Sequence, residues 1–577
     1  MSFLAILSLL HIWFLPGLIF VFLLPRLSWI DRILLSFPLS LTLNYLAVTS
    51  LTLLGFYNQQ VMLSLVVCEL LLLFMIGLRV GVFGEIRASL RVVNNGGVNI
   101  PLSGTNIAVL LIFILFFQNF SFQSVFQEWD AVVSYNRWAM DWARGDFPQY
   151  TWRYPQLLPI IYSITYVMIG SHQVQFFATA STVIFPLGIL VLFIRSFKFV
   201  EVNSVVVKLA LVFTVFLIAK IIKLRLLFSG MTEIPLIYFS LFCGYILLLM
   251  RELKTINYPF VLLVGFSVAA AGIAKQSGVF IVFAFLILVV LFVKNNRAGD
   301  FSHWHLFILS LTMVLIISPW YAYKQFEIHA ALDGSELPYM VSQAAQTGLL
   351  DKLKKGVDVF GSLGVVIWPL FLLGLRNSVC RTLALIFVIP YWAIWALLFS
   401  YDHRNFAVVI PGFAVIVAQG AEYLRSWIRV KNRRDLTQRV LRVLLPVAAL
   451  SLFSMLVMSV IKDSQSTRLL NKSLKSQRSI GEEIVNFHLY SYFQLHPSDG
   501  MIATEYLYLK YLPDLGHRYK GSSCDDGDPS SLEKVYFVLV APWCSGLAQE
   551  ARMEVMRASG TSDLIFEAEG YRFYKVR

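Results

Sequence analysis

The sequence predicts an all-α polytopic membrane protein that carries a small α/β domain at its C-terminus. Apolar residues make up 58% of the 577 residues and charged residues only 14%, and the mean hydropathy is +0.71. This composition lies far from that of soluble domains. Long apolar runs recur along residues 1–461, whereas residues 462–577 are polar and mixed. The chain therefore divides into a transmembrane domain, 1–461, and a tail domain, 462–577.

About fourteen apolar runs are long enough to cross roughly 30 Å of hydrocarbon. The first has no basic segment before it and is interrupted by His11 and Pro16, so it does not resemble a signal peptide. The predicted spans lie at 3–24, 33–56, 60–79, 105–120, 173–194, 204–222, 234–250, 259–274, 276–293, 304–320, 358–375, 382–400, 406–424 and 440–461.

The formal net charge of +13 is concentrated in alternate short loops between these spans. Such loops are cytoplasmic under the positive-inside rule, which explains the charge without a nucleic-acid partner. Both termini, the tail domain and the loop 121–172 then face outward. The basic loops carry Arg26, Arg32, Arg79, Arg87, Arg91, Arg195, Lys198, Arg251, Lys254, Lys294, Arg297, Arg376, Arg381, Arg425, Arg429, Lys431, Arg433 and Arg434.

One apolar segment, 156–169, conflicts with this topology if it is counted as a span, because every later basic loop would then face outward. We therefore expect it to be a juxtamembrane or re-entrant helix on the outer side.

The sequence of the tail domain predicts strands around one short helix. The stretches "MIATEYLYLKYL", "KVYFVLVAPW" and "LIFEAEGYRFYKVR" favour strands, and 547–558 favours a helix. About 115 residues are enough for a small α/β domain. Cys524 and Cys544 either form a disulfide in an oxidising compartment or remain two free thiols.

The outer loop 121–172 contains the stretch "EWDAVVSYNRWAMDWARGDFPQYTWRYPQ", which begins with two carboxylates, Glu128 and Asp130. Acidic groups at a membrane boundary are costly to keep and usually serve a function. Trp129, Trp138, Trp142 and Trp152 are expected to anchor this loop at the interface. A later outer stretch, "AAQTGLLDKLKKGVDVF", is amphipathic and is expected on the membrane surface.

Several outward-facing segments carry cations where the topology predicts few. The phosphate of a lipid is one partner that explains cations at this boundary. Snorkelling of long basic side chains toward headgroups is the other explanation, and it is the preferred one for Lys220. These cations are Lys220, Lys223 and Arg225 ahead of the acid Glu233, then Lys275 in a hairpin, and His403 with Arg404 in a late loop.

A carboxylate beside several cations suits one kind of chemistry. Transfer of a sugar from a lipid-linked phosphate needs a base for the acceptor hydroxyl and positive charge for the departing phosphate. It needs no general acid, because the phosphate leaves as an anion. Glycoside hydrolysis instead needs a pair of carboxyl groups that share acid and base roles. The residues therefore favour sugar transfer over hydrolysis.

The stretch Asp130–Phe147 resembles the first outer loop of the GT-C glycosyltransferases, and most closely that of lipid A aminoarabinose transferases and protein O-mannosyltransferase-like bacterial enzymes. It has the family's initial acid, short aromatic helix and Gly-Asp-aromatic ending, followed by a proline-containing helix. The resemblance extends over about residues 105–425. Ala131 stands where many relatives have a second acid, which leaves a divalent cation as an open question.

The resemblance implies roles for individual residues. Asp130 is the expected general base, with an N-cap of the following helix as the alternative; Glu128 is a weaker candidate base. Glu233 orients the acceptor, holds a cation or caps its helix. Arg153 and Tyr154 border the donor sugar or belong to an interfacial belt. Lys275, His403 and Arg404 bind the donor phosphate.

We therefore expect a GT-C-like, inverting integral membrane glycosyltransferase that uses a polyprenyl-phosphate sugar donor and a glycan, lipid or protein acceptor. We expect it in a bacterial inner (plasma) membrane, with its active site outside. Two alternatives are a polysaccharide ligase or polymerase that uses a pyrophosphate-linked glycan, and a transporter of a lipid-linked substrate. A transporter tends to have related halves, and the sequence has no internal repeat.

Overall fold

The computed structural model describes residues 2–80, 126–430 and 481–576, with gaps inside these ranges of which the longest are 332–347 and 523–534. The chain forms two compact units. One consists of Met1–Val125 with Asp141–Asp463 and is called the helical unit here. The other consists of Phe126–Met140 with Ser464–Arg577 and is called the sheet unit. Each unit is described by itself.

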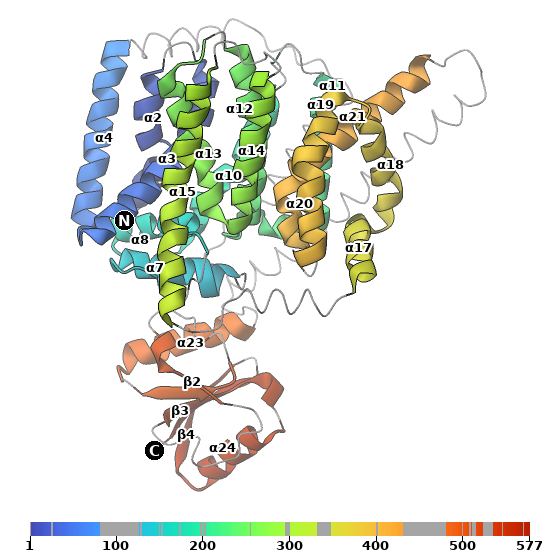
Figure 1. The fold of residues 1–577 in the computed structure, drawn as a ribbon. Coiled ribbons are helices and arrows are strands. Elements are labelled where there is room, and N and C mark those ends of the chain that lie inside the picture. Colours follow the sequence, from blue (N-terminus) through green and yellow to red (C-terminus); the bar gives the residue numbers. More distant parts are fainter. Residues whose placement is uncertain are drawn as a thin grey trace, which may run out of the picture. The chain divides into compact units, whose positions relative to one another are not determined.

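The helical unit is built from long apolar helices that run side by side (Figure 1). Its N-terminal half comprises α1 (Ser2–Trp13), α2 (Leu15–Phe22), α3 (Trp29–Leu53), α4 (Gln59–Val80), α8 (Leu157–Ile169), α9 (Phe176–Ala180), η2 (Ser181–Val183), α10 (Ile184–Ser196), α11 (Ser204–Leu217), η3 (Ile218–Ile222), η4 (Leu224–Phe228) and α12 (Glu233–Glu252).

The second half of the helical unit continues this arrangement. It comprises α13 (Tyr258–Ala274), α14 (Gln276–Lys294), α15 (His303–Ala331), α17 (Leu349–Val357), η5 (Asp358–Leu363), α18 (Gly364–Gly374), α19 (Ser378–Leu383), η6 (Ala384–Val388), α20 (Ile389–Ile394), η7 (Trp395–Phe399), η8 (His403–Val409) and α21 (Ile410–Val430).

Among the described residues, 10 helices are long and apolar enough to cross a membrane, or 11 if the bent pair α1 and α2 forms one span. This confirms the prediction of a polytopic helical membrane protein. The count of about fourteen is not confirmed. The predicted spans 105–120 and 440–461 lie outside the described residues, and the span 259–274 corresponds to the shorter apolar helix α13.

Small residues let neighbouring helices approach closely. A Cβ at Gly420 of α21 would stand 1.9 Å from the carbonyl oxygen of Leu370 in α18, and one at Gly374 would stand 2.1 Å from that of Ile416. Helices in lipid gain little from apolar burial, so close backbone packing of this kind contributes much of their association energy. These two glycines therefore fix how α18 packs on α21.

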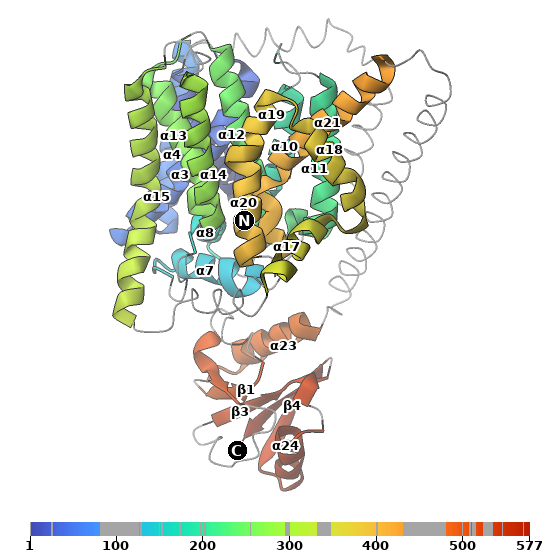
Figure 2. The ribbon, with the colours of Figure 1, turned by 45° about the vertical axis from the view of Figure 1, so that its right-hand side comes forward.

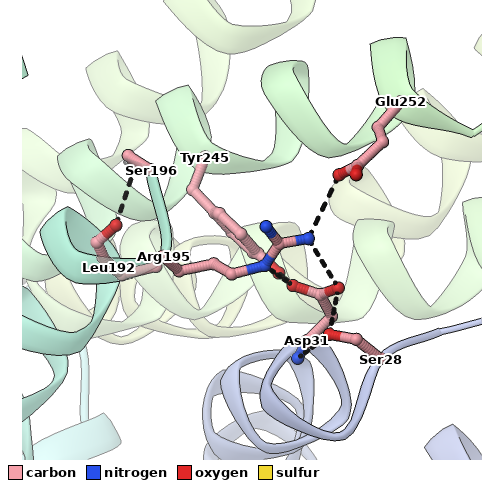
Figure 3. A network of polar contacts seen from close by, with 7 residues as sticks. All are labelled: Ser28, Asp31, Leu192, Arg195, Ser196, Tyr245 and Glu252. Carbon is pink, nitrogen blue, oxygen red and sulfur yellow. Dashed lines mark hydrogen bonds and ion pairs between the residues drawn. The ribbon is translucent and has the colours of Figure 1, made fainter. Parts of the chain in front are cut away.

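A buried polar network joins α3 to α10 and α12 (Figure 3). Asp31 accepts hydrogen bonds from Arg195 Nε at 2.6 Å and from the Tyr245 hydroxyl at 2.7 Å. Arg195 also donates to Glu252 at 3.1 Å. Since α10 and α12 follow the predicted outer loop and α3 precedes it, the network joins the N-terminal helices to the rest of the unit.

A second polar pair lies within the N-terminal helices. The Nδ1 atom of His11 in α1 lies 2.7 Å from Glu69 Oε2 in α4, and His11 is fully buried. Glu69 is near the middle of its 22-residue helix. Hydrogen bonds between polar side chains inside a membrane hold helices together. The pair therefore links α4 to α1 at the start of the chain. The face of α4 that does not pack against other helices is largely exposed.

The helix α8 covers the segment that the sequence predicted to be juxtamembrane or re-entrant. It has 13 residues, all of them buried. At about 1.5 Å per residue it spans about 20 Å, less than the roughly 30 Å of hydrocarbon. Tyr57 and Gln59 hold it by side-chain hydrogen bonds to Ser163 and to the Met168 carbonyl. Its length agrees with the prediction that it is no full span.

The sheet unit contains the predicted small α/β domain. Its five strands have the order β2-β1-β3-β5-β4, with β1 parallel to β2 and β3, and β5 antiparallel to β3 and β4. Aromatic residues such as Tyr506, Phe573 and Tyr574 fill its core. Its elements are η1 (Ala131–Asn136), α23 (Gly481–Leu495), β1 (Met501–Thr504), η10 (Gly516–Arg518), β2 (Tyr519–Gly521), β3 (Val535–Val540), η12 (Pro542–Cys544), α24 (Ala548–Ala558), β4 (Ser562–Ala568) and β5 (Tyr571–Val576), while α7 (Arg137–Ala143) crosses the boundary between the units.

The cysteines of the two units differ. Cys544 is disulfide-bonded, whereas Cys68, Cys243 and Cys380 are free. The expected partner, Cys524, lies outside the described residues. Of the two alternatives that the sequence left open, the structure favours the disulfide at Cys544.

Candidate functional site

The most connected group of predicted site residues centres on Lys275, in the turn between α13 and α14. Lys275 Nζ donates to Glu233 Oε1 at 3.2 Å and to the Asn405 side-chain oxygen at 3.1 Å. Glu233 is 2% exposed and Lys275 8% exposed. The first residue of α12, the α13–α14 turn and η8 are thus held by one ammonium group.

Lys275 keeps its charge despite this burial. Desolvation lowers the pKa of Lys275, but the carboxylates of Glu233 and Asp402 raise it more, and the net result is a pKa above the ordinary value. The second carboxylate oxygen of Glu233, Oε2, is buried and has no hydrogen-bond partner among the described residues. Glu233 therefore holds a cation, one of the roles considered for it, and that cation is a lysine of this chain.

A second ion pair lies beside the first in η8. Arg404 donates through Nε to Asp402 Oδ1 and through Nη2 to Asp402 Oδ2, each at 3.1 Å. Burial raises the pKa of Asp402, but Arg404 lowers it more, so the pKa lies below its ordinary value. The Arg404 side chain is 32% exposed. A guanidinium has five N–H donors, so one edge can hold a carboxylate while another faces an anion.

Lys220 and Lys223 differ from Lys275 because both are exposed. Among the described residues, neither has a carboxylate within ion-pair distance. They lie on and directly after η3, which contacts both η8 and η5. The Nζ atom of Lys220 lies 4.0 Å from the position that a Cβ at Gly361 would take. The structure therefore places two uncompensated ammonium groups next to the segment that carries Arg404.

Lys223 has an unusual backbone conformation, with φ of 76° and ψ of 133°. Among the described residues it is the one non-glycine with positive φ. Such a conformation costs about 1–3 kcal/mol and is often found at functional sites. The side chain of Arg225, two residues later, lies outside the described part of the chain.

The part of the predicted outer loop that belongs to the helical unit packs against α15. Trp142 is fully buried, and its ring lies 4.8 Å from that of Phe147 and 6.5 Å from that of Trp320. Trp320 Nε1 donates to the Tyr154 carbonyl at 2.9 Å, and Lys324 Nζ donates to that of Pro148 at 3.3 Å. The prediction that Trp142 anchors the loop at the interface was wrong, because the indole fills the interior.

The remaining predicted site residues of the helical unit differ in exposure. Tyr154 is half-buried and His403 is exposed, with its ring 6.0 Å from that of Trp395. Arg153 lies outside the described residues. The amphipathic segment forms α17, which exposes Leu350 and lies at the same end of the helical unit as α8 (Figure 2).

Glu128 and Asp130 belong to the sheet unit and are half-buried. Asp130 occupies the N-cap position of η1, but its side chain makes no capping hydrogen bond. Capping, the alternative to a catalytic role, is therefore not what this side chain does. Among the residues that the structure describes, no group of three or more His, Cys, Asp or Glu side chains is arranged to hold a metal ion.

The sequence carries no motif that points to Asn405, which bonds Lys275, or to Trp395, whose Nε1 donates to the Asp402 carbonyl at 3.1 Å. No pattern around Asn405 marks it, because its partner lies 130 residues away. Its place next to Arg404 was the one available signal.

Comparisons with solved structures identify distant similarities. The chain aligns with crystal structures of ArnT from Cupriavidus metallidurans, in the apo state and bound to undecaprenyl phosphate, at TM-scores of 0.46 and 0.47 and identities of 13% and 12%; each alignment covers 82% of this chain and 98% of the other. It also aligns with the Archaeoglobus fulgidus oligosaccharyltransferase tethered with an acceptor peptide, at a TM-score of 0.42 and 12% identity, over 76% of this chain and 69% of the other. No family model and no curated protein matches the chain.

Proposed function

We propose that the protein is an integral membrane glycosyltransferase that moves a sugar from a polyprenyl-phosphate donor to an acceptor hydroxyl on the extracytoplasmic face. The observation that carries the proposal is the concentration of cations where η3 meets η8. Lys220 and Lys223 are exposed on and directly after η3, and η3 contacts η8, the segment that contains Arg404. The sequence resemblance of the stretch Asp130–Phe147 to GT-C enzymes supports the same function.

These cations suit the leaving group of the reaction. When the bond between the anomeric carbon and the phosphate oxygen breaks, the phosphate takes the electron pair and gains negative charge. Ammonium and guanidinium groups stabilise this charge best where they are already in place before the reaction. Lys220, Lys223 and Arg404 would do so, whereas the ammonium of Lys275 already serves Glu233 and Asn405.

Asp130 is the base in this proposal on the strength of the sequence resemblance alone. Its carboxylate takes the proton of the acceptor hydroxyl while the oxygen attacks the anomeric carbon, and the phosphate departs from the opposite side. A single displacement of this kind inverts the anomeric configuration. Glu128 is the second candidate base in the same segment. The acceptor is a glycan, a lipid or a protein.

The test is sugar transfer by the purified full-length protein in detergent, with a panel of polyprenyl-phosphate sugars as donors and cell-envelope extract as acceptor. We expect transfer by the wild type and a loss of at least about 100-fold in Asp130→Asn, the usual contribution of a general base. Asp351→Asn, which changes an exposed carboxylate on α17, is the matched control. Undiminished transfer by folded Asp130→Asn would remove Asp130 as the base. Donor binding without transfer would favour a transporter.

The cations are tested separately. Lys220→Ala and Lys223→Ala should each raise the KM for the donor, because each removes a charge from the phosphate site. Lys223→Gly removes the same charge but relieves the positive φ, so it should raise KM and increase thermal stability together. Lys294→Ala, at the opposite end of α14 from Lys275, is the control and should leave KM unchanged.

A further inference from the structure

Lys275 is joined to Arg404 through one residue, Asn405. The Asn405 side-chain oxygen accepts from Lys275 Nζ at 3.1 Å. The Asn405 backbone carbonyl accepts from the Tyr391 hydroxyl at 2.8 Å. Asn405 is therefore held at both its side chain and its backbone, and the residue before it in η8 is Arg404.

The geometry leaves little of Lys275 available for the donor phosphate. Two of the three N–H donors of an ammonium are used by Glu233 and Asn405, and the residue is 8% exposed. Arg404, in contrast, is 32% exposed at its side chain. Arg404 and Lys275 lie in one connected network. Because Arg404 is exposed and Lys275 is buried, we infer that they have different roles.

We propose that Lys275 and Asn405 are positioning residues that fix η8 so that the Arg404 guanidinium meets the donor phosphate. Lys275 anchors Asn405 to the first turn of α12, and Asp402 aligns the guanidinium along one edge. The inference rests on the proposed phosphate site. It adds that Arg404 contacts the ligand, whereas Asn405 acts through Arg404 alone.

These two roles predict that the effects of substituting Arg404 and Asn405 on ligand binding are not additive. Residues that act through one another show an interaction energy in a double-mutant cycle, whereas independent residues add. If Asn405 acts through Arg404, its removal matters in the wild type and has no further effect once Arg404 is gone. If Asn405 touches the ligand itself, the two losses add.

The experiment measures the Kd of a polyprenyl monophosphate for the purified full-length protein in detergent, with Arg404→Ala, Asn405→Ala and the double variant. We expect Arg404→Ala to bind about tenfold more weakly, the usual effect of losing one charge-assisted hydrogen bond. Asn405→Ala should bind several-fold more weakly, and the double variant should match Arg404→Ala. Additive losses, or unchanged binding by Asn405→Ala, would overturn the positioning role. Unchanged binding by Arg404→Ala would overturn the phosphate site as well.

A second set of variants separates positioning from fold stability. Lys275→Met alone leaves the buried Glu233 carboxylate without its cation and is expected to lower stability. The double variant Lys275→Met/Glu233→Gln removes both charges and should regain stability while its Kd stays as weak as that of Asn405→Ala. Lys275→Arg, which keeps the cation, should bind more tightly than Lys275→Met. A double variant with wild-type Kd would show that Lys275 serves only to neutralise Glu233, and would overturn the proposal.

Discussion

Arg195, near the end of α10, bonds Asp31, near the start of α3, through Nε at 2.6 Å and Nη2 at 3.0 Å. Asp31 is 2% exposed and Arg195 7% exposed. The pair links segments 164 residues apart. A buried ion pair is costly to form, but removing one partner costs more, because the other charge stays buried.

Asp31→Ala should therefore lower the free energy of unfolding by about 3–5 kcal/mol. Glu252→Ala, which removes the half-exposed partner of the same guanidinium, should cost only about 0–1 kcal/mol. Denaturant unfolding in detergent, followed by tryptophan fluorescence, measures both. Equal losses in the two variants would contradict the assignment of Asp31 as the principal partner of Arg195.

The end of α8 provides a test of backbone conformation. Gly170 has φ of 75°, a left-handed conformation that disfavours any side chain. Gly170→Ala should lower stability by about 1–2 kcal/mol. Gly244→Ala is the matched control, because Gly244 lies within α12 and a Cβ there meets no atom within 4 Å. Thermal unfolding should show a loss for the first variant and no loss, or a gain, for the second.

The Asp402–Arg404 pair predicts a dependence of stability on pH. The pKa of Asp402 lies below its ordinary value of 3.8 in the folded protein. A carboxyl group with a lowered pKa stabilises the fold above its unfolded pKa, and this stabilisation is lost as the pH falls through the folded pKa. The Asp402→Asn variant keeps an oxygen for the Arg404 backbone N–H but has no charge. The difference in melting temperature between wild type and variant should be constant from pH 7 to about pH 5 and shrink below 3.8. A difference in melting temperature that grows as the pH falls would contradict the predicted direction.

The disulfide at Cys544 predicts a pattern of thiol labelling. The chain has 5 cysteines, of which Cys68, Cys243 and Cys380 are free. Alkylation of the denatured protein should label these alone without reductant, and all cysteines after reduction. Cys544→Ser should lower the stability of the sheet unit by about 2–4 kcal/mol. Full labelling without reductant would contradict the disulfide.

Much of the fold is predictable from the sequence, because membrane spans depend on local composition. Runs such as 33–56 and 276–293 became α3 and α14 with small shifts at their ends, since a long apolar run in lipid must satisfy its backbone within its own helix. The shorter helix α8 was also expected, from the charge of the loops around it. The three tail stretches predicted to form strands contain β1, β3, β4 and β5.

The candidate site was only partly predictable. Sequence position identified Glu233, Lys275 and Arg404 as unusual polar residues at one boundary, but it did not say which were paired. Trp142 was expected at the interface and is buried, because its partner Trp320 comes from a distant helix. Asn405 had no local pattern at all.

The sequence by itself determined the membrane class and the long apolar helices such as α3 and α14, because each depends on residues close together in the chain. Only the tertiary structure decided which charges compensate one another. Lys275 meets Glu233 across 42 residues and Asn405 across 130, and burial then commits its ammonium to the protein interior. Lys220 and Lys223 remain exposed with their charges, because no carboxylate among the described residues folds against them.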